Sequence, residues 1–168
     1  MRFSAKVMLL GDIGVGKTSL ARRLVFGKFD ADYKTTIGVD ILTHELKLVG
    51  RPEDVWAKLL LWDTDGDFGH HIFKSVYISG ASGALIVADS SRPQTLEKMF
   101  ALAAGFAEAA PGRPVLGLVN KADIVRPDLA AHDRLGLPED QIMITSAKSG
   151  ENVAAAFEGI AETIYRRR

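Results

Sequence analysis

The sequence contains no cysteine among its 168 residues. This absence excludes disulfide bonds, thiolate metal sites and cysteine-based catalysis within the chain. Prenylation and palmitoylation also need a cysteine, so we expect no lipid anchor. The N-terminal run MRFSAKVMLL is too short and too polar for a secretory signal peptide. We therefore expect a cytoplasmic protein.

Long apolar runs and an excess of charge are also missing. No apolar stretch approaches the roughly 20 residues that a membrane-spanning helix needs. Lys and Arg together number 21, as do Asp and Glu, so the formal net charge is zero. A balanced chain has no bulk attraction for nucleic acid, which we do not expect as a partner. The length and the 47% apolar content fit a single domain over residues 1–168.

Apolar, β-branched runs alternate along the chain with stretches of helical period. Strands are predicted at residues 5–10, 39–49, 55–62, 84–88, 115–119 and 142–145, and helices at 17–26, 93–109 and 151–165. The short polar segment between residues 49 and 55 indicates a hairpin. This order predicts an α/β fold with about six strands in a mostly parallel sheet and helices on both faces. The antiparallel edge strand is expected at residues 39–49.

The first strand is followed by GDIGVGKTS, residues 11–19, which fits the phosphate-loop pattern G-x-x-x-x-G-K-[ST]. Glycines let the backbone curl so that successive N–H groups face phosphate oxygens, and the following helix adds its N-terminal dipole. Lys17 would give its charge to the β- and γ-phosphates, and Thr18 would offer its hydroxyl to Mg²⁺. A Gly-rich turn without a ligand is the alternative, but the strand before and the helix after favour the phosphate loop.

The third strand runs into WDTDGDF, residues 62–68. In open α/β sheets, ligands lie at the C-terminal ends of the strands. Asp63 is therefore expected to hold Mg²⁺ through water, and the N–H of Gly66 is expected to meet a γ-phosphate. An Asp-Gly turn without a ligand is common. The phosphate loop earlier in the chain favours the ligand-binding interpretation.

Polar segments follow the last two strands, NKAD at residues 120–123 and TSAK at 145–148. A carboxylate such as Asp123 can accept two hydrogen bonds side by side. Guanine offers such a pair of donors on one edge and adenine does not, so this pattern indicates a guanine-selective pocket. Alone, NKAD is also compatible with a turn and a helix cap. Its place after a strand, downstream of a phosphate loop, favours base recognition.

These segments, with YKTTIGVD at residues 33–40 and GASGALIVAD at 80–89, resemble the Ras superfamily of small GTP-binding proteins, and within it the Rab branch. The likeness covers nearly the whole chain. It implies a P-loop G domain that binds GTP or GDP with Mg²⁺ and hydrolyses GTP. It also implies that effector, exchange or activating proteins bind at residues 34–40 and 63–77.

The resemblance assigns roles to particular side chains. Phe29 would stack near the guanine and Lys121 would pack on it, while the N–H of Ala147 would meet the base oxygen. The implied nucleotide-binding residues are Asp12, Ile13, Gly14, Val15, Gly16, Lys17, Thr18, Ser19, Phe29, Tyr33, Thr36, Asn120, Lys121, Asp123, Ser146, Ala147 and Lys148. The implied Mg²⁺ ligands are Thr18, Thr36 and Asp63, and the residues implied in hydrolysis are Lys17, Thr36, Gly66 and Asp67.

Three positions depart from the family pattern. Asp67 stands where the family carries a water-positioning Gln, Asp65 replaces an Ala, and Ile13 replaces a small residue. An ionised Asp only accepts hydrogen bonds, whereas Gln also donates, and losing one well-aimed donor typically slows chemistry about 100- to 1000-fold. Residues 28–38 contain no Arg, and Ile13 would crowd an arginine supplied by a partner. We therefore expect slow unaided GTP hydrolysis.

Several alternatives remain open at this stage. Asp67 could act as a base, or His70 or His71 could guide the water, since neutral imidazole donates and accepts. The acids at residues 65 and 67 also suit a nucleotide-loaded binding module that does not hydrolyse GTP. An ATP-using enzyme on the same loop is a further alternative, which the NKAD segment disfavours.

Two surface features have competing interpretations. Trp62 belongs either to a partner-binding surface, as the resemblance implies, or to the core or the sheet edge. The C-terminal residues 166–168 are all Arg and suit the helix dipole. They would also attract anionic lipid, but without a lipid anchor we expect membrane contact that is at most weak.

Overall fold

The strand β1 (Arg2–Gly11) lies in the middle of the sheet and is buried from Val7 to its end, because its side chains pack into core layers on both faces. The computed structural model describes residues 1–30, 36–129 and 136–168. None of the helices within these ranges is long and apolar enough to cross a membrane.

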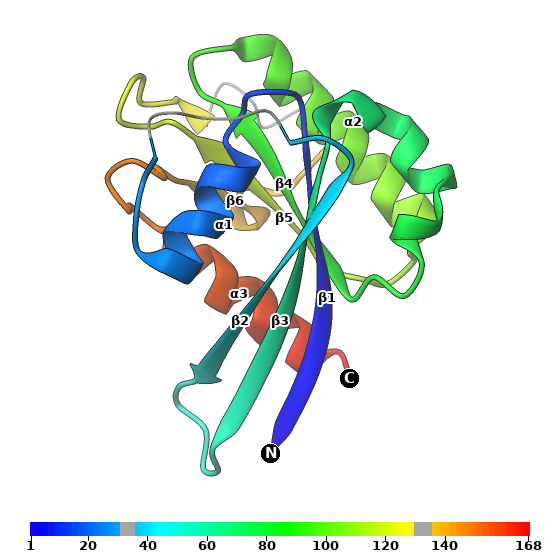
Figure 1. Ribbon diagram of the computed structural model, residues 1–168, viewed down its shortest axis with the longest axis vertical. Coiled ribbons are helices and arrows are strands. Elements are labelled where there is room, and N and C mark those ends of the chain that lie inside the picture. Colours follow the sequence, from blue (N-terminus) through cyan, green and yellow to red (C-terminus); the bar gives the residue numbers. More distant parts are fainter. Residues whose placement is uncertain (31–35, 130–135) are drawn as a thin grey trace.

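Six strands form one sheet in the order β2-β3-β1-β4-β5-β6. The other strands are β2 (Val39–Leu48), β3 (Val55–Thr64), β4 (Gly83–Asp89), β5 (Val115–Asn120) and β6 (Ile142–Ile144). The hairpin strand β2 runs antiparallel to β3, and the remaining neighbours are parallel. The predicted mostly parallel sheet with an antiparallel edge at β2 is confirmed (Figure 1).

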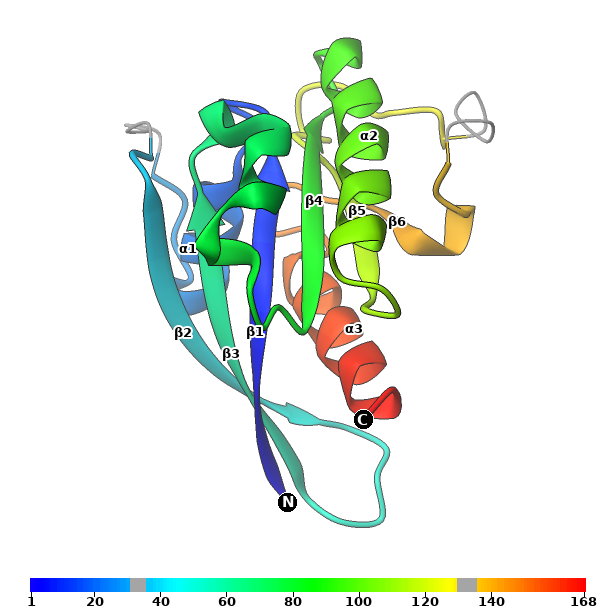
Figure 2. The same cartoon turned by 90° about the vertical axis from the view of Figure 1, so that its right-hand side faces the viewer.

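Three α-helices occur in the described residues, namely α1 (Lys17–Phe26), α2 (Pro93–Ala109) and α3 (Val153–Arg166). Figure 2 shows α2 on one face of the sheet, with α1 and α3 on the other. The first two helices have the predicted bounds. The third was predicted to begin at residue 151, which is wrong, because Gly150 and Asn152 have positive φ angles of 87° and 56° that helix geometry does not allow.

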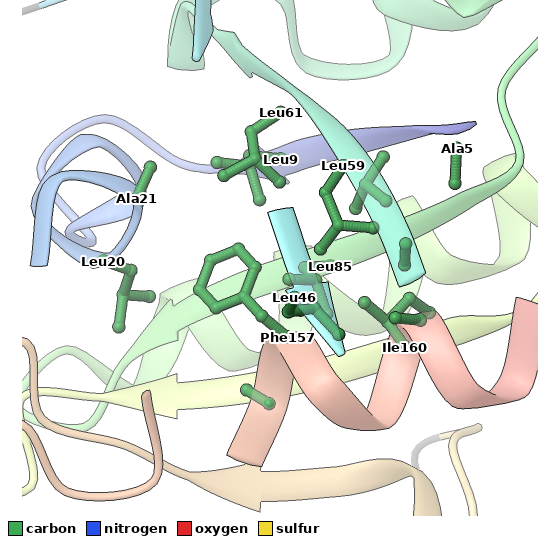
Figure 3. Packing of buried hydrophobic residues seen from close by; sticks show 14 of the residues in the cluster. Ala5, Leu9, Leu20, Ala21, Leu46, Leu59, Leu61, Leu85, Phe157 and Ile160 are labelled. Carbon is green, nitrogen blue, oxygen red and sulfur yellow. The ribbon is translucent and has the colours of Figure 1, made fainter. Parts of the chain in front are cut away.

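The alternation of side chains along β1 divides the core into two layers. Val7 and Leu9 pack on the side of α1 and α3, where Phe157 is fully buried (Figure 3). Met8 and Leu10 pack on the other side, against α2. Burial on both faces fixes the position of β1, and therefore of the loop that follows it.

The segment after β3 contains short 3₁₀ helices, η1 (Gly66–Lys74) and η2 (Val76–Ile78), and a third, η4 (Glu139–Gln141), precedes β6. Ile72 of η1 is buried in the layer that faces α2. The ring of Phe73 lies so close to Gly105 of α2 that a Cβ there would overlap it. The segment is thus attached to α2 through two apolar side chains.

Candidate nucleotide-binding site

The loop between β1 and α1 has a backbone that depends on glycine. Gly14 and Gly16 have positive φ angles of 73° and 104°. A Cβ at Gly16 would also overlap the Asn120 side-chain nitrogen. Larger residues are therefore excluded where this loop meets the loop after β5.

Lys17 lies beneath this loop and is only 6% exposed. Its ammonium donates hydrogen bonds to the carbonyl oxygens of Gly11 at 2.9 Å and Asp12 at 2.8 Å. Burial lowers the pKa of Lys17 to about 8, although Asp63 and other nearby acids oppose the shift. A buried cation held only by carbonyl groups is well suited to an anionic ligand.

Thr18, Thr36 and Asp63 come together from α1, from the segment before β2 and from β3. The hydroxyl oxygens of Thr18 and Thr36 are 2.6 Å apart, and the Thr18 hydroxyl donates to Asp63 Oδ2. The second carboxylate oxygen of Asp63 is buried without a hydrogen-bond partner in the described residues, and burial raises the pKa of this carboxyl. A buried, unsatisfied carboxylate oxygen beside two hydroxyls fits Mg²⁺, which prefers oxygen ligands.

Gly66 brings the segment after β3 against the phosphate loop. A Cβ on Gly66 would overlap the backbone nitrogen of Ile13, so only glycine fits. The N–H of Asp65 donates to the Gly38 carbonyl at 2.8 Å. The expected γ-phosphate-sensing residue thus lies where the phosphate loop and the segment before β2 meet.

Asp67 and the two histidines lie at the surface of η1. Asp65 caps this helix, since its carboxylate accepts a hydrogen bond from the Asp67 N–H at 2.9 Å. Asp67, His70 and His71 are all exposed, and the His70 ring contacts Phe73 with a centroid distance of 5.8 Å. This segment therefore presents its polar side chains to solvent.

The loops after β5 and β6 form a cavity of about 300 Å³ with the phosphate loop. Its lining consists of Gly14, Gly16, Ser19, Phe29, Asp30, Asn120, Lys121, Asp123, Ile124, Ala147 and Lys148. Most of the predicted nucleotide-binding residues thus line one cavity, while Val15 of the phosphate loop and Lys17 and Thr18 at the start of α1 are not among its lining residues. Tyr33, also predicted, lies outside the described residues, as do Lys34 and Thr35 of the expected partner-binding segment.

Asn120 joins the loops of this cavity. Its amide nitrogen donates to the Val15 carbonyl at 3.0 Å. Its oxygen accepts from the Thr145 hydroxyl at 3.1 Å and from the Ala147 N–H at 3.2 Å. The N–H that we expected at the base oxygen therefore donates to Asn120 here.

Asp123, the predicted base-reading acid, accepts a hydrogen bond from the Ser146 hydroxyl at 2.8 Å. Ser146 is itself 1% exposed. The second carboxylate oxygen of Asp123 takes no part in this hydrogen bond, and Asp123 lines the cavity. Ser146 thus fixes the orientation of the acid expected to recognise guanine.

Sequence reasoning overlooked Asp89, at the end of β4, together with Arg92 and Lys98. Asp89 is 1% exposed and lies 3.0 Å from the Lys121 ammonium. Burial would raise the pKa of Asp89, but the Ser91 hydroxyl and Lys121 hold it below the usual value. The available signal was position, because Asp89 lies at the C-terminal end of a parallel strand, as Asp63 and Asn120 do.

Trp62 has both a buried and an accessible side. It packs against the core layer that faces α2, with Tyr77 at a ring-centroid distance of 6.4 Å. The Lys6 ammonium lies 3.7 Å from the Trp62 ring centroid. Large apolar side chains are exposed in the segments before β2 and after β3, with Ile37 90% and Val76 81% exposed. Core packing of Trp62 is thus observed, and its role in partner binding stays a prediction.

Comparison with known proteins agrees with this geometry. The family described as Ras of Complex, Roc, domain of DAPkinase matches residues 6–123. Ras-related protein RABA2a of Arabidopsis thaliana is 34% identical over 166 residues, which cover 96% of this chain and 75% of that protein. Ras-related protein rab-11.1 of Caenorhabditis elegans is 32% identical over 166 residues, covering 96% of this chain and 77% of its own. The chain therefore belongs to the Ras superfamily of small GTPases and is Rab-like.

Proposed function

We propose that this GTP-binding switch hydrolyses GTP slowly unless a partner assists it. The supporting observation is a contrast within the site. Lys17 and Asp63 are buried at the expected phosphate and Mg²⁺ positions, whereas Asp67 is exposed. The chain thus carries the groups expected to hold the nucleotide, whereas Asp67 cannot supply the hydrogen-bond donor that a Gln would offer.

The residues that hold the nucleotide act mainly by charge and position. Lys17 would meet the β- and γ-phosphates, and successive loop N–H groups would meet their oxygens. Thr18, Thr36 and Asp63 would hold Mg²⁺, which neutralises charge on those phosphates. Asp123 would accept hydrogen bonds from the guanine edge, which excludes adenine.

Slow hydrolysis follows from three side chains near the γ-phosphate position. Asp67 can accept from a water molecule but cannot donate to a phosphoryl oxygen. Asp65 adds negative charge, and like charges about 4 Å apart cost on the order of 4 kcal/mol at an effective dielectric near 20. Ile13, 39% exposed, would crowd an arginine supplied by a partner.

Single-turnover hydrolysis of radiolabelled GTP tests this proposal. We expect purified protein to convert GTP far more slowly than the same protein with a cell extract that supplies partners. Lys17→Ala protein, prepared in the same way, measures contaminating activity. Rapid hydrolysis by the purified protein alone would contradict slow unaided turnover.

A non-hydrolysing binding module is the second candidate. The acids Asp65 and Asp67 favour it, because both repel the charge that builds up during hydrolysis. The nucleotide that co-purifies with the protein separates the candidates. Retained GTP supports the module, and GDP supports turnover.

We also propose a cytoplasmic protein that binds its partners across residues 34–40 and 63–77. Ile37 and Val76, one in each segment, support this surface because they expose large apolar side chains that would suit apolar contacts with a partner. Val76→Asp should abolish GTP-dependent capture of binding proteins while nucleotide affinity is unchanged. Equal capture of binding proteins by wild-type and Val76→Asp protein would refute this binding surface as proposed.

A further inference from the structure

Arg92, which precedes α2, contacts the phosphate loop from outside the cavity. Its Nη1 donates to the Ile13 carbonyl at 2.9 Å, and its Nη2 lies 3.7 Å from Asp12 Oδ2. Lys98 of α2 lies 3.2 Å from the other Asp12 oxygen. Two cations from the α2 region therefore meet a single turn of the phosphate loop.

The same turn is also held from within. Asp12 Oδ1 accepts a hydrogen bond from the Ile13 N–H at 2.8 Å. Burial would raise the pKa of Asp12, but this N–H, Lys98 and Arg92 hold it below its usual value. Asp12 thus fixes the peptide before Ile13, and Arg92 fixes the peptide after it.

Anchoring the Ile13 carbonyl also determines the direction of the next N–H. A trans peptide is planar, so its C=O and N–H point in opposite directions. With the Ile13 carbonyl directed at Arg92, the Gly14 N–H points away from Arg92. Gly14 lines the nucleotide cavity, so this N–H is available to a ligand there.

The contacts of Arg92 continue to the base-binding loop. Its Nη1 is 3.9 Å from Asp89 Oδ2, which is in turn 3.0 Å from the Lys121 ammonium. Lys121 adopts a left-handed φ of 65°, and its carbonyl accepts from the Ser90 hydroxyl at 2.9 Å. A chain of alternating charges therefore joins the phosphate loop to the base-binding loop.

We propose that Arg92 is a positioning residue that orients the Gly14 N–H toward the nucleotide diphosphate. This inference rests on the proposed nucleotide site. It does not require Arg92 to touch the ligand. A role in stability alone would be small, because the side chain is 36% exposed and ion pairs of that kind contribute little to folding.

The test compares GDP with GMP, which lacks the β-phosphate. Arg92→Gln should weaken GDP binding about tenfold, the usual consequence of losing a charged hydrogen bond. GMP affinity should change little, so the ratio of the two affinities should fall. Arg92→Lys, which keeps the charge without the planar fork, should lie between the two proteins.

Two control variants sharpen the result. Arg2→Gln removes an exposed arginine that pairs with Glu45, far from the site, and should leave both affinities unchanged. Lys98→Gln removes one partner of Asp12 but keeps the Arg92 bond to Ile13, so its effect should be smaller than that of Arg92→Gln. The melting temperature without nucleotide should be nearly equal in all four variants.

The possible failures are distinguishable. Suppose that wild-type protein binds GDP. If Arg92→Gln then lowers the affinities for GDP and GMP equally, or changes neither affinity, the positioning role is refuted and nucleotide binding stands. If wild-type protein takes up no GDP at any Mg²⁺ concentration, the proposed function itself fails, and the inference fails with it.

Discussion

The loops after β1, β5 and β6, here called the nucleotide-holding loops, and the segment at residues 65–78 both carry polar and charged side chains. The two regions differ in how these side chains are placed. In the loops, the polar side chains of Lys17, Asn120 and Ser146 are buried and hydrogen-bonded across the site. In the segment, Asp67 and His70 are exposed. We therefore expect nucleotide binding and turnover to depend on separable parts of the chain.

The difference in anchoring explains why the two regions should respond differently to mutation. Asn120 connects three loops, so a change there disturbs the whole cavity. Residues 65–78 instead rest on α2 through Ile72 and Phe73. Changes to exposed side chains in that segment should alter the rate of hydrolysis and leave affinity alone.

Lys17→Ala should give the largest effect, on affinity. It removes the buried ammonium and should weaken GDP binding about 100-fold or more, the usual result of losing one partner of a buried charge pair. Isothermal titration measures the change. Lys28→Ala, a lysine outside the loop, serves as the control, and comparable losses in both variants would contradict the central role of Lys17.

Gly66→Ala should selectively impair GTP binding. The new Cβ would overlap the Ile13 nitrogen, so the Gly66 N–H must move away from the γ-phosphate. Overpacking of this kind costs about 2 kcal/mol, which predicts roughly 30-fold weaker binding of a GTP analogue. GDP affinity should change much less.

Gly159→Ala is the matched control for that substitution. Gly159 lies within α3 with open space around it, so an added methyl group should be neutral for both nucleotides. Equal losses of GTP and GDP binding in Gly66→Ala would show that the loop as a whole had been displaced, against selective γ-phosphate sensing.

Asp67→Gln should change rate without changing affinity. Restoring a donor near the attacking water should speed single-turnover hydrolysis about tenfold, less than a fully aimed donor gives because Ile13 and Asp65 remain. Asp67→Asn separates the effect of side-chain charge from that of side-chain length, since Asn is uncharged but one methylene shorter than Gln. Slower hydrolysis by the Gln variant would instead identify Asp67 as the base.

Local sequence patterns predicted the parts of the site that depend on neighbouring residues. The phosphate loop follows from glycine spacing, and α1 begins at Lys17 as predicted. Contacts between distant residues could not be predicted in this way. Arg92 and Ile13 are separated by 79 positions, and only packing of α2 beside β1 and β4 brings them together. The close contact between Phe73 of η1 and Gly105 of α2 likewise joins residues that are distant in sequence.

Asp89→Asn should give the smallest effect, on stability. The pKa of Asp89 is held low in the folded protein, so its contribution is present above its ordinary pKa near 3.8 and is lost as the pH falls below that value. The variant should be about 1 kcal/mol less stable than wild type at pH 7, with the gap closing toward pH 3, as urea unfolding would measure. Asp54→Asn removes a pair with Lys47 in which the acid is 70% exposed, and should change stability less. A gap for Asp89→Asn that stays constant with pH would mean that Asp89 acts through its hydrogen bonds with Ser91, and that its charge does not link the two nucleotide-holding loops.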